Sequence, residues 1–161
     1  MSVAHDLFSE INPAFCAYAL VAFSKAYSSV NEKGPELPVV YLALPVALSG
    51  DLAAAFEGTN KNTGLLEWLE RTPQVQIGLT ERVNASLGIV TEAVRFGCFS
   101  RLLTLDEGAR LKAGERKIKK SVTTSLSEGL AQSLKRAERL GYWFASAGST
   151  KTIFDMMGLT V

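Results

Sequence analysis

The sequence is poor in the residues that most often carry out chemistry at an active site. Its 161 residues include one histidine, His5, and two cysteines, Cys16 and Cys98. Serine and cysteine nucleophiles usually need a histidine as general base, and zinc sites need clustered Cys and His ligands. The two cysteines form no CxxC motif and no Cys/His cluster, so we expect small buried residues without a disulfide. The sequence therefore predicts no catalytic residue, no metal and no cofactor.

A phosphate-binding loop is also missing. Residues 147–152 read AGSTKT, which places a threonine after Lys151 as in a Walker A motif. However, that motif needs glycine at the positions of Thr150 and Ala145. We instead interpret Gly148 as the end of one helix and Ser149 as the N-cap of the next.

Long hydrophobic runs are absent too. The strongest apolar stretch begins at Leu37, and Pro38, Pro45 and Asp51 interrupt it before the roughly 18 residues that a membrane-spanning helix needs. The first ten residues contain no Lys or Arg, whereas a secretory signal has a basic start. We therefore expect a cytoplasmic protein that does not contact a membrane.

The composition is that of a globular chain, with 47% hydrophobic and 20% charged residues. The length fits one domain over residues 1–161. The net charge of +1 hides an asymmetry, because residues 1–60 carry 2 basic and 6 acidic side chains while residues 61–161 carry 15 and 10. Basic residues crowd into one segment, the basic tract, which favours either an anionic partner or a solvated loop. The basic tract consists of Arg110, Lys112, Arg116, Lys117, Lys119 and Lys120.

The N-terminal third predicts a buried helix followed by a strand. Asn12 and Pro13 have the pattern of an N-cap and a proline at the first helical position. Apolar residues cover most of the circumference of a helix over residues 15–27, which should be buried on most sides. The proline-bracketed run 38–45 is short and rich in Val, so it predicts a strand. A short helix over 51–57 and a turn over 58–62 follow.

Residues 63–112 have the outline of a winged helix. Thr63 is expected to cap a first helix, and Thr72 and Pro73 end it and begin a second. Gly88 separates this helix from a third one over residues 89–96, which Gly97 ends. A hairpin over 101–105 and 109–112, with glycine in its turn, completes the pattern. A free-standing winged-helix regulator that binds DNA is one interpretation of this order.

Residues 121–161 predict a C-terminal helical segment. Ser125 and Glu128 form an S-x-x-E capping box, after which apolar residues recur every three or four positions through Leu140. A last short helix precedes Gly158. Together these patterns predict a mainly α fold of the α+β class: a compact helical domain with a winged-helix-like core, a small β-hairpin and extra helices at both ends.

Short motifs spread over nearly the whole chain suggest a family. They begin with residues 12–16 (NPAFC), the proline-bracketed run that ends at Pro45, and the pattern of Leu66, Trp68 and Leu69. More specific motifs lie near the C-terminus and comprise Lys135, Arg136, Ala137, Leu140, Gly141, Trp143, Phe144, Ala145, Ala147, Gly148, Ser149, Thr152, Ile153 and Gly158. On all these motifs, the chain resembles the middle component of bacterial three-component ABC ATPase systems, the Lamassu-type conflict systems that act against phage and plasmids. Tyr142 departs from the family pattern, because arginine is usual there.

The resemblance implies a non-catalytic adaptor that joins a separately encoded SMC-like ABC ATPase to an effector subunit such as a nuclease. ATP hydrolysis then belongs to the partner. Under this hypothesis the basic tract approaches DNA within the complex, and apolar residues of the first and last helices hold the partners. The tryptophans Trp68 and Trp143 suit either a core or an interface. The candidate interface residues are Phe15, Trp143, Phe144, Ser149 and Phe154.

Overall fold

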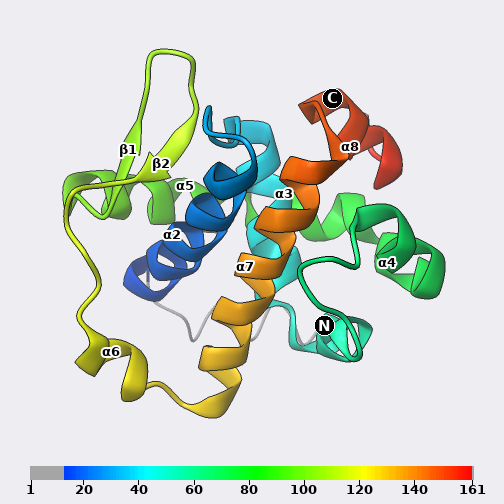
Figure 1. Ribbon diagram of the computed structural model, residues 1–161, viewed down its shortest axis with the longest axis horizontal. Helices are drawn as coiled ribbons and strands as arrows, with labels where there is room; N and C mark the ends of the chain where they lie inside the picture. Colours follow the sequence, from blue (N-terminus) through cyan, green and yellow to red (C-terminus); the bar gives the residue numbers. More distant parts are fainter. Residues whose placement is uncertain (1–12, 161) are drawn as a thin grey trace.

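The computed structural model describes residues 13–160 and is mostly helical, with one small antiparallel sheet in that range (Figure 1). This confirms the mainly α fold class. The elements in chain order are α2 (Pro13–Val30), α3 (Leu37–Leu48), the 3-10 helix η1 (Gly50–Phe56), α4 (Leu65–Arg71), the 3-10 helix η2 (Pro73–Gln76), α5 (Leu79–Phe99), β1 (Leu103–Leu105), β2 (Leu111–Ala113), α6 (Lys120–Thr124), α7 (Glu128–Ala147) and α8 (Thr150–Met156).

The centre of the fold is the pair of helices α2 and α7, which lie side by side, with α3 and α5 packed against them (Figure 1). Their backbones approach closely at Gly141. A Cβ atom added there would lie 2.4 Å from the carbonyl oxygen of Phe23 and 3.0 Å from the backbone nitrogen of Tyr27. Because real Cβ atoms do not come so near, only glycine allows this approach.

Aromatic side chains fill the core on the other side of α7. Trp68 and Trp143 are both fully buried, and their ring centroids lie 5.1 Å apart. Phe56 stacks on Trp143 at 5.8 Å. The indole nitrogens donate hydrogen bonds to backbone carbonyls, Trp68 to Ala55 at 2.8 Å and Trp143 to Asn60 at 2.9 Å. Both tryptophans are therefore core residues. Trp143 also holds the turn at Asn60 against α7, and Trp68 joins α4 to η1.

The expected strand over residues 38–45 is wrong, because this run forms helix α3. Nearly every side chain from Val39 to Leu48 is buried, so the segment shows neither the alternation of a half-exposed strand nor the stripe of an amphipathic helix. Pro38 lies in the first turn, where its missing N–H costs nothing, and Pro45 is accommodated inside the helix. The Ser49 hydroxyl, just past the helix, donates to the Pro45 carbonyl.

The winged-helix outline is not confirmed. The start of the expected second helix is the separate 3-10 helix η2, and its remainder joins the expected third helix in one continuous helix, α5, which passes through both Gly88 and Gly97. Gly88 faces open space. A Cβ at Gly97 would lie 2.3 Å from the Leu103 side chain, so Gly97 lets β1 pack closely against α5 and does not end the helix. The hairpin itself is confirmed, with Leu103 opposite Ala113 and Leu105 opposite Leu111.

The expected helix caps are partly displaced. Helix α7 begins after Ser127, whose hydroxyl accepts the Leu130 N–H at 3.4 Å, whereas Ser125 ends the unpredicted helix α6. Gly64, with a positive φ, precedes α4 in place of Thr63.

The junction of α7 and α8 is as expected, with Gly148 ending one helix and the Ser149 hydroxyl accepting the Thr152 N–H at 3.1 Å. Pro13 begins α2, and its expected cap Asn12 lies outside the described residues.

We predict that Gly141→Ala lowers the free energy of unfolding by about 1–3 kcal/mol, because the new methyl group overlaps the α2 backbone. Gly129→Ala is the matched control. It lies in the same helix with nothing within 4 Å of the added carbon, so it should raise stability by roughly 0.5–1 kcal/mol. Urea denaturation followed by tryptophan fluorescence measures both. Equal stability of Gly141→Ala and the original chain would contradict the close approach of the helices.

Candidate partner groove and basic tract

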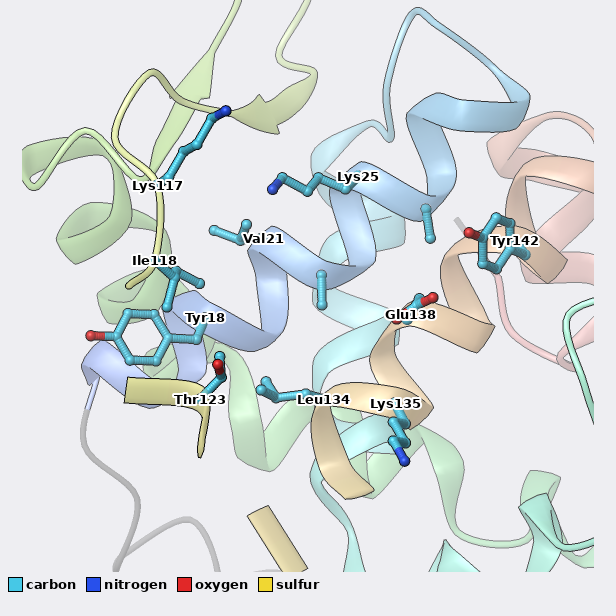
Figure 2. A pocket seen from close by; sticks show the side chains of 12 residues that line it. Tyr18, Val21, Lys25, Lys117, Ile118, Thr123, Leu134, Lys135, Glu138 and Tyr142 are labelled. Carbon is cyan, nitrogen blue, oxygen red and sulfur yellow. The ribbon is translucent and has the colours of Figure 1, made fainter. Parts of the chain in front are cut away.

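An open groove lies between α2, α7 and the segment that leads into α6 (Figure 2). Its volume is about 510 Å³. Its apolar lining, which we call its floor, comes from Val21, Ala22, Ala26, Leu134 and Ile118, and Tyr18 and Tyr142 also line it. We call this the α2–α7 groove.

The sequence of α2 explains why the groove exists. Tyr18, Val21, Ala22 and Lys25 are spaced three, four and seven residues apart, so they form one stripe along the helix. Almost all other faces of α2 are buried against α3, α5 and α7. Ala22 has only a methyl group, which leaves space between the two helices that a larger side chain would fill.

Three lysines surround the groove. Lys25 comes from α2, Lys117 from the segment before α6 and Lys135 from α7, and all three are exposed. In Figure 2, Lys25 and Lys117 lie in the upper part of the view and Lys135 in the lower part, and Glu138 lies between Lys25 and Lys135. Among the ion pairs of residues 13–160 none involves these lysines. The groove is therefore apolar at its floor and positive at its rim.

The basic tract divides into two parts with different surroundings. The Arg110 guanidinium donates to the Gly34 carbonyl at 2.7 Å and lies 3.8 Å from the Glu36 carboxylate. Lys112 is half-buried on β2. Arg110 therefore fixes the hairpin to the loop after α2. The other four, Arg116, Lys117, Lys119 and Lys120, are exposed at the start of α6 and in the loop before it.

The candidate interface residues do not form one surface. Phe15 is 5% exposed, and Trp143 and Phe144 are fully buried, so their side chains belong to the core. Phe144 packs edge-on against Phe23 of α2, with ring centroids 6.0 Å apart. Ser149 is exposed and acts as a helix cap, and Phe154 is half-buried. A role in partner binding stays a prediction for this group, and only the last two offer accessible surface.

Arg136 of α7 is buried, with 8% of its surface exposed. Its Nε donates to the Ala47 carbonyl at 2.8 Å, and a terminal nitrogen donates to the Ser133 hydroxyl at 2.9 Å. Burial lowers the pKa of the Arg136 guanidinium. Ala47 lies in the last turn of α3, where carbonyls lack helical partners and a positive charge is favourable. Arg136 therefore caps α3 from α7.

Two further arginines hold the same region. Arg82 of α5 binds both carboxylate oxygens of Asp51, at 3.0 and 2.8 Å, and the Ser49 hydroxyl at 2.7 Å. Arg139 donates to the Phe56 carbonyl at 3.3 Å and to the Thr59 hydroxyl at 3.0 Å. Sequence analysis missed these contacts, because nothing local distinguishes these arginines from solvated ones.

The two thiols are shielded from solvent to different degrees. Cys16 is fully buried, and burial raises its pKa to about 11. Cys98 is half-buried, and burial raises its pKa as well. Both cysteines are therefore protonated near neutral pH, which makes them poor nucleophiles. The described part of the chain contains no group of three or more His, Cys, Asp or Glu side chains that could hold a metal ion.

Comparison with known families identifies the chain. The family model described as ABC-three component (ABC-3C) system Middle Component 3 matches residues 4–161. The chain belongs to this family. It is thus a middle component of an ABC-three component system, which places it among other components of one system. No curated protein and no solved structure matches it.

The family match spans the features described above. Residues 4–161 include α2, α7, the groove between them and the whole basic tract. Between residues 13 and 160 of this middle component, no single helix is long and apolar enough to cross a membrane, although α3 and η1 together reach the length with a bend of 92° between them.

We predict that Arg136→Met lowers the free energy of unfolding by about 1–3 kcal/mol, because the buried Ala47 carbonyl loses its donor. Lys135→Met changes the neighbouring exposed residue and should stay within about 0.5 kcal/mol of the original chain. Urea denaturation compares the two. If both substitutions had the same effect, Arg136 would not act as the cap of α3.

Proposed function

We propose that this middle component is a non-catalytic adaptor in a Lamassu-type system, where it joins an SMC-like ABC ATPase to an effector subunit such as a nuclease. The observation that carries the proposal is the family match over residues 4–161, since a middle component functions within a system of several parts. ATP binding and hydrolysis then belong to the ATPase subunit, and the effector supplies the activity against phage or plasmid DNA.

The arrangement of surfaces supports a linking role, which needs at least two separate contact areas. The α2–α7 groove is one. A second hollow of about 410 Å³ lies beside α4, between Glu67, Glu70 and Met156, with Leu66 in its lining. Leu66 is 60% exposed, and the nearby Ile77 is 76% exposed. In Figure 1, α4 and α6 lie at opposite sides of the molecule. The two hollows share no lining residue, which supports binding of two partners at separate surfaces.

Coexpression tests the adaptor role. We predict that the full chain copurifies with the two proteins encoded beside its gene, and that the ATPase and the effector copurify with each other only when this chain is present. The measurement is affinity purification through a tag on the ATPase, followed by size-exclusion chromatography. An ATPase and effector that associate equally well without this chain would contradict the proposal.

We further propose that Arg116, Lys117, Lys119 and Lys120 contact the DNA backbone within the assembly, because they form the exposed half of the basic tract. Contacts to phosphates depend strongly on salt and carry little sequence information. Arg110 and Lys112 are less suited to this role, since Arg110 is held by Gly34 and Glu36 and Lys112 is half-buried.

Replacement of Arg116, Lys117, Lys119 and Lys120 by glutamate should abolish DNA binding by the assembly, measured by gel shift at low salt. The matched control changes Lys33, Lys61, Arg95 and Lys151 to glutamate. These are also exposed, and the net charge falls by the same amount. The control should retain most of the binding. Equal loss in both variants would assign the effect to overall charge and not to the basic tract.

A further inference from the structure

The α2–α7 groove has a shape and a charge that select a particular kind of occupant. From Tyr18 to Ala26 it follows nine residues of α2, whose eight steps correspond to about 12 Å or roughly two helical turns. Burying its apolar floor would be favourable for any ligand with apolar side chains. The three lysines at the rim, against the single carboxylate of Glu138, favour a ligand that carries negative charge.

The walls of the groove decide between an extended and a helical ligand. An extended peptide binds by adding a strand to an open sheet edge. Here two walls are the helices α2 and α7, whose backbone hydrogen bonds are made within each helix. Only side chains are available for contacts there. An amphipathic helix is the ligand that uses such a groove, with apolar residues spaced three, four and seven apart.

We propose that the α2–α7 groove binds an acidic amphipathic helix of a partner subunit. Apolar side chains of that helix lie on Val21, Ala22 and Leu134, and its flanking Asp or Glu residues face Lys25 and Lys135, which leaves Lys117 to the proposed DNA contact (Figure 2). This inference rests on the proposed adaptor function and identifies one of its docking sites. DNA fits the rim charges but not the apolar floor, because its backbone offers phosphates and no apolar groups to bury.

Photo-crosslinking in the copurified assembly tests which molecule occupies the groove. Benzoylphenylalanine replaces Tyr142, an aromatic residue that already lines the groove. Leu87 of α5, exposed and outside the groove, receives the same group as a control. We expect the probe at Tyr142 to crosslink to a partner segment in which acidic residues flank a helical apolar stripe, and the probe at Leu87 not to crosslink to that segment.

Several outcomes would overturn the proposal. A crosslink from Tyr142 to residues 1–12 of the same chain, to a second copy of this chain, to DNA or to no molecule would each assign the groove to something else. In these cases the assembly still forms, so the adaptor function stands. If the full chain copurifies with no neighbouring gene product, the adaptor function itself fails, and the docking site fails with it.

Charge reversal supplies an independent measurement. Lys25→Glu places a negative charge at the rim, and Lys33→Glu makes the same change at an exposed lysine in the loop after α2. We expect Lys25→Glu to weaken binding of the crosslinked partner about tenfold, and Lys33→Glu to change it less than twofold, by titration of the purified subunits. Equal affinities for the two variants would contradict electrostatic recognition at the groove.

Discussion

The close approach of α2 and α7 at Gly141 is the contact on which the other features of this fold depend. With the Gly141 backbone against Phe23 and Tyr27, the two helices lie nearly in backbone contact. One consequence is that Phe144 reaches Phe23 across the same interface. On the opposite face of α7, Trp143 points into the aromatic cluster with Phe56 and Trp68. A single helix thus joins two parts of the core.

Three arginines from α7 and α5 hold the segments that surround this central helix pair. Arg136 and Arg82 hold the C-terminal end of α3, and Arg139 holds the turn that follows η1. Their acceptors are mostly backbone carbonyls and hydroxyls, so they compensate for hydrogen bonds that the helix ends leave open. The outer side of the α2–α7 pair is not covered in the same way. There the small side chain of Ala22 and the loop before α6 leave the groove open.

The middle component thus has a closely packed interior and, on its outer side, accessible surfaces such as the α2–α7 groove. The C-terminal motifs that carry the family resemblance illustrate the point, because Trp143 and Phe144 are fully buried in the core. Their large aromatic side chains serve the core packing that positions α7. The surfaces suited to partners consist of less conspicuous residues, such as alanine, leucine and lysine, brought together from separate segments.

The sequence by itself determined the family, the mainly α class, the hairpin and the Gly148–Ser149 helix junction. The hairpin and the helix junction depend on glycine and serine, whose backbone and capping preferences act locally, and the family depends on motifs that are read directly from the sequence. Tertiary structure decided the rest. The run 38–45 became a helix because burial on all sides removes any periodic signal, and α5 continued through Gly88 and Gly97 because packing outweighs the modest helix penalty of glycine. The α2–α7 groove combines residues more than a hundred positions apart, so only the folded chain could reveal it.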